Sequence, residues 1–266
     1  MLRVTLFGFP RWDTWRLAGG TVAVRVVVAV ALALTLIGAF GRTSGVQAAP
    51  ARPAYSCTYH CYGINDWPGG PINGSHTAES VVQLSCTPGA SLCGQGWFVD
   101  NEMWLADNGS SYSYWVEAGY STYSNDHYTS IDYFWADQRP GSSYYEHVLS
   151  TVPSGDYGNY ANITIKRSSS SSFSVSISSP NYSYSGSSTG NSMTPNDINI
   201  GQELYGTSGA SAPTAHFISN QWIDTSNVSH YQTANGSITS DNPPHAGWTT
   251  WPSSSSTGGN MYTYCC

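Results

Sequence analysis

Short runs of alternating apolar and polar residues recur along most of this chain, and they predict strands. The clearest runs are Trp97–Ala106, Ser113–Tyr120, Ser130–Trp135, Tyr144–Ser150, Tyr160–Lys166, Ser172–Ser178, Ile198–Tyr205 and Ala215–Ile223. Turn residues separate several of them, at Asp107–Gly109, Arg139–Gly141, Pro153–Gly155 and Tyr184–Gly186. Many strands without a helical period predict an all-β fold, an antiparallel sandwich of jelly-roll or concanavalin-like type.

The run Trp97–Ala106 carries acids inside a strand that also suits a core. Alternation places an apolar set on one face: Val99, Met103 and Leu105. The opposite face carries Asp100, Glu102 and Trp104. Only 9% of the chain is charged, so a carboxylate within a well-patterned strand is a candidate for chemistry.

The same alternation sorts the side chains of three further strands. Val116 with Ala118, Phe134 with Ala136, and Ile198, Ile200, Gln202 with Leu204 are the predicted core sets. If the strands share one sheet, its other face gathers acids and aromatics: Glu102, Trp104, Trp115, Glu117, Tyr133, Trp135, Asp137, Glu203 and Tyr205. Carboxylates among aromatic rings predict a groove for a polymer, either peptide or glycan. Ordinary packing aromatics and solvated surface acids are the alternative.

The N-terminal segment 1–48 has the features of a secretory signal peptide. Arginines precede an apolar run from Val26 to Phe40, and Val46-Gln47-Ala48 supplies a small-residue cleavage pattern before Ala49. An uncleaved anchor is the alternative. We therefore expect a secreted, extracellular protein without a membrane partner after cleavage. Residues 49–266 form the predicted single domain, with an irregular Ser/Gly/Pro-rich strap over 237–266.

Charge narrows the classes of partner. Without residues 1–48 the chain keeps four basic and fifteen acidic residues, a net charge of about −11. Such a surface repels nucleic acid and anionic lipid, so neither is an expected partner. We expect a monomer that acts on an extracellular peptide or polysaccharide.

Six cysteines follow the signal segment: Cys57, Cys61, Cys86, Cys93, Cys265 and Cys266. An even number in an exported chain predicts disulfide bonds, and Cys86–Cys93 is the simplest local pair. The remaining four would then join the two ends of the domain. Zinc is the rival interpretation, but a terminal Cys-Cys lacks the usual ligand spacing. Asp132 and Asp137 could hold Ca²⁺, although no ligand spacing demands it. No metal or cofactor is expected.

A Cys-bounded loop, Cys86 to Cys93, precedes the strand Phe98-Val-Asp-Asn-Glu102. Gly201-Gln-Glu203 and an aromatic segment with Asn220 and Asp224 follow later in the chain. In this order the motifs resemble those of the neprosin-type glutamic peptidases and, more distantly, those of the eqolisin group of fungal glutamic peptidases. These stretches cover about a quarter of the chain beyond the signal segment.

The resemblance implies a β-sandwich endopeptidase with Glu102 and Glu203 as its catalytic pair. Trp104, Glu117 and Tyr205 would contact substrate, and the face defined above adds Trp115 and Trp135. One carboxylate would deprotonate water while its protonated partner polarises the scissile carbonyl. Such a pair titrates as a unit and favours acidic pH.

Three other functions suit the same residues. A glycoside hydrolase on this kind of sandwich also needs two carboxylates facing one cleft. A carbohydrate-binding module or lectin would stack sugar rings on Trp104, Trp115 and Trp135. A structural exoprotein would use none of them. Because both enzyme functions need Glu102 and Glu203 on one face, the distance between these carboxyl groups is the decisive observation.

Overall fold

A computed structural model describes residues 59–86, 98–107, 114–122, 130–206, 210–211, 213–232, 238–242, 245–250 and 259–264. The predicted signal peptide, residues 1–48, lies outside these ranges. Residues Arg52–Cys266 form one compact unit. Across the described ranges, we find no helix with the length and apolar character needed to cross a membrane.

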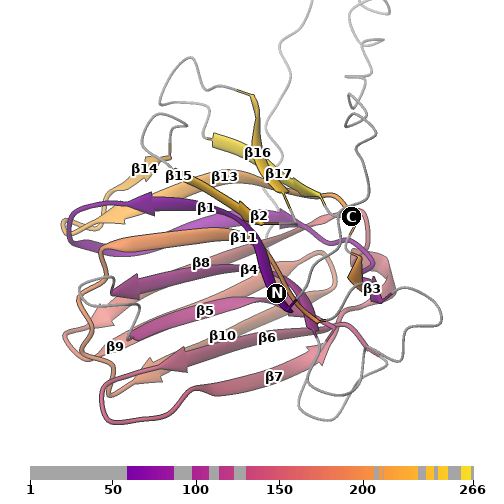
Figure 1. Ribbon diagram of the computed structural model, residues 1–266. Coiled ribbons are helices and arrows are strands. Elements are labelled where there is room, and N and C mark those ends of the chain that lie inside the picture. Colours follow the sequence, from indigo (N-terminus) through magenta and orange to yellow (C-terminus); the bar gives the residue numbers. More distant parts are fainter. Residues whose placement is uncertain are drawn as a thin grey trace, which may run out of the picture. The chain divides into compact units, whose positions relative to one another are not determined.

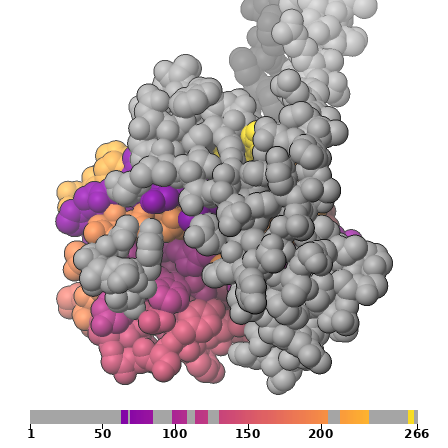
Figure 2. Space-filling view, in the orientation of Figure 1, coloured from indigo at the N-terminus to yellow at the C-terminus, as the bar shows by residue number. Residues whose placement is uncertain are grey.

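The first of two large sheets contains seven antiparallel strands (Figure 1). Their order across the sheet is β15 (Ile238–Asn242), β1 (Tyr59–Pro68), β11 (Asp197–Gly206), β4 (Phe98–Asp107), β5 (Tyr114–Ser121), β6 (Asp132–Gln138) and β7 (Tyr145–Thr151). β7 is an edge strand with exposed residues at both ends, and the rose-coloured part of the chain that contains it forms the lower rim in Figure 2.

The second sheet also pairs its strands in antiparallel fashion. Its order is β10 (Tyr182–Thr189), β9 (Ser172–Ser179), β8 (Tyr160–Ser169), β2 (Ile72–Ser80), β13 (Ala215–Asp224), β17 (Gly259–Tyr264) and β16 (His245–Thr250), with β14 (Ser229–Tyr231) beside β13. The short strands β3 (Ser85–Cys86) and β12 (Ala210–Ser211) pair separately. The 3₁₀ turn η1 spans Ser154–Asp156.

The core lies between the two sheets because each strand directs one set of alternating side chains inward. In β4, Val99, Met103 and Leu105 have no exposed surface. From the other sheet, Ile163 and Ile165 of β8 are equally buried, as are three residues of β9: Phe173, Val175 and Ile177. The predicted antiparallel β-sandwich of jelly-roll type is therefore confirmed.

Each of the eight predicted strands corresponds to a strand of the structure: β4 to β9, β11 and β13. The Arg139–Gly141 turn is also found, with Gly141 at φ +76° and the Ser142 amide bonded to the Arg139 carbonyl. The turn predicted at Tyr184–Gly186 is wrong, because these residues lie inside β10.

The region 237–266 differs from the irregular strap that its composition predicts. Its described residues contain three strands: β15 belongs to the first sheet, and β16 and β17 belong to the second. In β17, Met261 and Thr263 are buried and alternate with less buried neighbours. The alternation depends on one apolar and one polar residue, so a search for apolar periodicity misses this strand.

Candidate active site

The face of β4 that points away from the core carries the acids that the sequence singles out. Asp100 and Glu102 are 5% and 1% exposed, and Trp104 beside them is partly exposed. The cross-strand partners of these residues come from β5 on one side and β11 on the other. The predicted separation of the core set from the acidic set of β4 is therefore confirmed.

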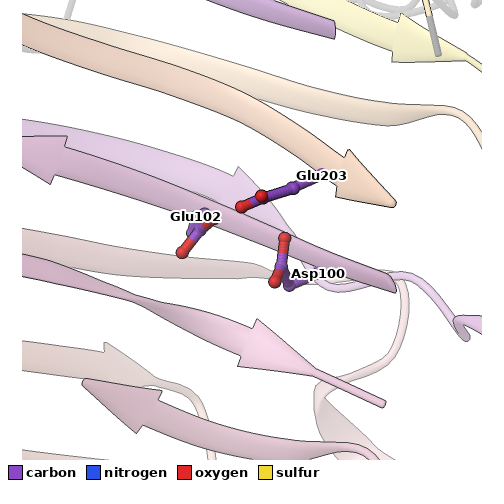
Figure 3. Close-up of side chains that lie close together, drawn as sticks. All are labelled: Asp100, Glu102 and Glu203. Carbon is purple, nitrogen blue, oxygen red and sulfur yellow. The ribbon is translucent and has the colours of Figure 1, made fainter. Parts of the chain in front are cut away.

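Three carboxyl groups converge where β4 and β11 pair. Glu203 lies directly opposite Asp100, and Glu102 is opposite Gly201, so Glu102 and Glu203 are diagonal neighbours. Carboxylate oxygens of Asp100, Glu102 and Glu203 all lie within 4.8 Å of one another. In Figure 3, the Glu203 carboxyl group points from β11 toward the two acids of β4. Such distances are within the reach of one bridging water molecule.

Glycines flank Glu102 on both neighbouring strands. Gly119 of β5 and Gly201 of β11 are its two cross-strand partners. A β-carbon built on Gly119 would lie 2.7 Å from the β-carbon of Glu102, closer than real β-carbons approach. Gly201 has the same restriction toward β1, where a β-carbon would lie 2.7 Å from the Ile64 α-carbon. The two glycines thus leave the sides of Glu102 without neighbouring side chains.

Burial and mutual repulsion make the cluster retain protons. Burial raises the pKa of Glu102 well above its usual range, and the charges of Asp100, Glu117 and Glu203 raise it further. Burial is also the largest cause that raises the pKa of Asp100, and the charges of Glu203 and Glu117 raise it further. The Glu102 and Glu203 carboxyl groups are close enough to repel each other when both are charged, which favours a proton on Glu102.

Glu117 of β5 lies on the same face, opposite Trp104. Burial and the charge of Glu203 raise the pKa of Glu117 to about 8. The hydrogen bond from Tyr144 acts in the opposite direction and lowers this pKa, as do the nearby side chains of Trp115 and Trp104. The Tyr144 hydroxyl donates to Glu117 Oε1 at 2.8 Å, and its ring lies 6.1 Å from that of Trp115. Glu117 is thus linked to the acid cluster by charge and to Tyr144 by a hydrogen bond.

The structure brings together most of the residues that the sequence selects. Glu102 and Glu203 meet, and Trp104, Trp115 and Glu117 share their face. Tyr205 lies opposite Phe98 in the ladder, on the same alternating set as Glu203, although its side chain is not among those described. The substrate-binding roles of these residues stay predictions.

Trp135 corrects the predicted face of β6. It is the cross-strand partner of Ala118, which faces the core, so Trp135, Tyr133 and Asp137 point toward the second sheet. Phe134 and Ala136 lie instead on the outer face of the first sheet, which carries Glu102 and Glu117 and is called the acid-bearing face below. The inversion arises because the polar atoms of the buried set find partners on the second sheet. Trp135 Nε1 donates to the Tyr184 hydroxyl at 2.8 Å, and the Ser188 hydroxyl donates to Asp137.

Asp100 and Tyr144 are the site residues that the sequence analysis did not select. Asp100 appeared on the correct face but lacked a predicted partner, because the register of β4 against β11 is not readable from the sequence. Tyr144 directly precedes β7 and reaches Glu117 across the sheet. No spacing signal within the chain could have identified this contact.

The described part of the chain offers one group that could hold a metal ion, formed by Asp100, Glu102 and Glu203. Oxygen ligands suit hard cations, but they bind only when deprotonated. Because burial raises the pKa of both Asp100 and Glu102, a proton competes strongly with a cation here. The cysteines give no test of zinc or disulfides, since no cysteine side chain is among those described.

The fold and the site together define an antiparallel β-sandwich with a carboxyl cluster on the outer face of one sheet. No protein-family model matches the sequence, and no curated protein matches it. Solved glutamic peptidases share the fold. Scytalido-glutamic peptidase bound to a transition-state-analogue inhibitor matches with a TM-score of 0.55 at 10% identity, over 80% of this chain and 100% of that chain.

A second structure of that peptidase, with a peptide-based transition-state analogue, has a TM-score of 0.54 at 10% identity. SCP-B, a member of the eqolisin family solved with the tripeptide Ala-Ile-His, has a TM-score of 0.52 at 10% identity. Each covers 80% of this chain and 100% of its own. At this level of identity the similarity establishes a shared fold, and the eqolisin part of the predicted resemblance is supported at that level.

Proposed function

We propose that this protein is a secreted glutamic-type endopeptidase in which Glu102 and Glu203 activate water at acidic pH. The observation that carries the proposal is the approach of these two carboxyl groups to within 4.8 Å of each other on adjacent strands. Two carboxyl groups that share one proton form the acid–base pair needed for hydrolysis without a covalent intermediate. The glutamic peptidases of similar fold were solved with peptide-like ligands, which is consistent with this choice of substrate.

Burial assigns the two roles. Glu102 is 1% exposed and its pKa is raised, so it holds the proton and donates it to the scissile carbonyl oxygen. Glu203 is partly exposed and carries the negative charge as the base. A water molecule loses a proton to Glu203 as its oxygen bonds to the carbonyl carbon. The product of this step is a neutral tetrahedral gem-diol.

The second step reverses both proton transfers. Glu203 delivers its proton to the amide nitrogen, and the carbon–nitrogen bond breaks. A hydroxyl proton of the diol returns to Glu102, so the pair regains its starting state while an acid and an amine leave. Asp100 stays protonated in acid because burial and the charge of Glu203 raise its pKa. A neutral Asp100 can donate a hydrogen bond to the charged Glu203 opposite it.

The close contact favours a peptidase over the glycoside hydrolase alternative. The two carboxyl groups of a retaining glycosidase stand roughly 5–5.5 Å apart, and those of an inverting enzyme stand further apart. Oxygens of the Glu102 and Glu203 carboxyl groups lie within 4.8 Å of each other, which is closer than either of these arrangements. The aromatic residues Trp104 and Trp115 still suit either polymer, so substrate identity is tested directly.

Two substitutions test the proposal: Glu102→Gln and Glu203→Gln. Each should abolish cleavage of a denatured protein at acid pH while the melting temperature stays at or above that of the wild type. Glu146→Gln is the matched control, because Glu146 lies on β7, at the edge of the same sheet. It should keep full activity.

Two outcomes would contradict a peptidase. Wild-type protein that cleaves a β-glucan and no denatured protein would show a glycoside hydrolase. Wild-type protein that cleaves neither substrate but is retained on a polysaccharide column would show a binding module. Either result would remove the catalytic assignment of Glu102 and Glu203 in peptide hydrolysis.

A further inference from the structure

A pair of buried amide side chains lies directly behind the carboxyl cluster. Asn101 precedes Glu102 in β4, Gln202 precedes Glu203 in β11, and the two are cross-strand partners. Both have no exposed surface, and both face the core. Gln202 Nε2 donates to Asn101 Oδ1 at 2.9 Å. Each proposed catalytic residue therefore directly follows, in the chain, one member of a hydrogen-bonded amide pair.

The hydrogen bonds continue from this pair across both sheets. Asn101 Nδ2 donates to the hydroxyl group of Tyr120 on β5 at 2.5 Å. The Tyr120 hydroxyl in turn donates to the carbonyl oxygen of Ser80 on β2, at 2.7 Å. It also accepts from the Val82 amide at 3.0 Å. One chain of donors thus joins β11, β4 and β5 of the first sheet to β2 of the second.

Asn101 and Gln202 are polar residues on strand faces that are otherwise apolar. The other core-facing residues of β4 are Val99, Met103 and Leu105, and those of β11 are Ile198, Ile200 and Leu204. Within the described residues, Gln202 Oε1 has no hydrogen-bond partner, which is unfavourable for a buried amide oxygen. An apolar residue at position 202 would fill this core without that cost, so the amide contributes something other than burial.

Apolar strands alone distinguish poorly between registers that differ by two residues, because such a slip keeps every side chain on its own face. A slip of two residues would put Gln202 opposite Met103 and Asn101 opposite Leu204, which would break the hydrogen bond between the two amides. It would also move Glu203 by about 6.7 Å along β4 and place it directly opposite Glu102. A buried polar pair that is satisfied in only one register is an established means of fixing that register.

We infer that Asn101 and Gln202 are positioning residues whose hydrogen bond holds β4 and β11 in the register that sets Glu102 diagonal to Glu203. The inference rests on the proposed function only for the catalytic meaning of that geometry. The register itself is measurable without any activity.

The test uses four variants of the amide pair in the full-length protein, together with one control substitution. Asn101→Leu and Gln202→Leu each remove one partner of the buried amide–amide hydrogen bond, so both should lower the melting temperature. The double variant Asn101→Leu/Gln202→Leu removes both amides and should recover the melting temperature. The exchanged pair Asn101→Gln/Gln202→Asn restores an amide on each strand. Met103→Leu, a core substitution on the same strand, is the matched control.

Two measurements are made on each variant. NMR contacts between α-protons of β4 and β11 report the register, and kcat and KM on a denatured protein report the chemistry. We expect the double apolar variant to show mixed registers and a kcat reduced at least tenfold, with KM nearly unchanged. The exchanged pair and Met103→Leu should keep the single native register and a kcat within about threefold of wild type.

A double apolar variant that keeps one native register and the wild-type kcat would overturn the inference. If the wild type cleaves no peptide, the proposed function fails, yet the NMR register still decides the role of the amide pair. If the double apolar variant recovers its melting temperature but not the native register, the amide pair positions the strands and does more than stabilise the fold.

Discussion

Gly119 and Glu102 are cross-strand partners whose backbones are so close that a β-carbon on Gly119 would lie 2.7 Å from that of Glu102. The Gly119→Ala substitution therefore has to push β4 and β5 apart or displace Glu102. We expect a loss of about 1–3 kcal/mol in the free energy of unfolding and a lower kcat. Denaturant titration and peptidase kinetics measure the two effects.

Gly70→Ala is the matched control for this substitution. A β-carbon on Gly70 would meet nothing within 4 Å, so stability and activity should not change. Equal effects of the two substitutions would contradict the steric argument at Gly119.

Stability should fall as the pH rises through the neutral range. The pKa of Glu117 is raised from 4.5 to about 8 by burial and by Glu203. The folded protein therefore keeps a proton that the unfolded chain has lost, so the stabilisation is complete below pH 4.5 and disappears toward pH 8. Between those limits this group lowers the free energy of unfolding by about 1.4 kcal/mol per pH unit.

Asp66 and Glu146 change stability in the same direction, because burial is the largest cause that raises their pKa values to about 8 and about 7. Thermal melts from pH 4 to pH 8 test the trend, and Glu117→Gln should make the slope shallower. A melting temperature that is constant over this range would show that these carboxyl groups ionise normally in the folded protein.

Tyr144→Phe should raise the pKa of Glu117 above its value of about 8, because the tyrosine hydroxyl stabilises the ionised carboxylate through a 2.8 Å hydrogen bond. NMR titration of ¹³C-labelled glutamate carboxyl groups measures the change. Tyr145→Phe is the control, since Tyr145 is the next residue and is 59% exposed. No displacement of the Glu117 titration in the Tyr144 variant would show that the contact is absent in solution.

Chelation should leave acid proteolysis unchanged. Asp100, Glu102 and Glu203 have the spacing for a cation, but the proposed reaction needs a proton within this cluster. Activity is compared before and after dialysis against EDTA, and again with added Ca²⁺ at neutral pH, where carboxylates compete better for cations. Loss of activity on chelation and recovery with Ca²⁺ would make the cluster a metal site.

Two tryptophan substitutions should change different properties, one the stability of the fold and the other the KM. Trp135→Phe removes the 2.8 Å bond to Tyr184 and reduces the ring area stacked on His147, so it should lower stability by about 1–3 kcal/mol with little change in KM. Trp104→Ala should raise KM with a smaller effect on stability, because Trp104 is partly exposed on the acid-bearing face. Kinetics and thermal melts on both variants separate the two roles.

Alternation in the sequence was sufficient for strands whose core face is apolar, such as β4 and β8. It missed β2, whose core-facing set is polar: Ser75, Thr77 and Glu79. It also missed β10, where a serine-rich stretch with Gly186 has the composition of a turn. In both strands, pairing with neighbours supplies what the local sequence does not indicate.

The candidate site was predictable in part for the same reason. The sequence identifies Glu102 and Glu203 as unusual acids on strands, but it does not fix which residues of β4 and β11 are opposite each other. The pairing of Glu203 with Asp100 is a property of the register. On β6 both faces are buried, so alternation alone cannot decide whether Trp135 or Phe134 faces the core.

The position of β11 between β1 and β4 has a consequence for the nascent protein. β1 and β4 emerge early during synthesis, yet they become members of one sheet only when a strand from about a hundred residues later inserts between them. Such long-range pairing is slow compared with local contacts. Glu102 therefore has no partner acid from β11 until this insertion. Under the proposed function, a chain in which β11 has not yet joined the sheet lacks the carboxyl pair that hydrolysis needs.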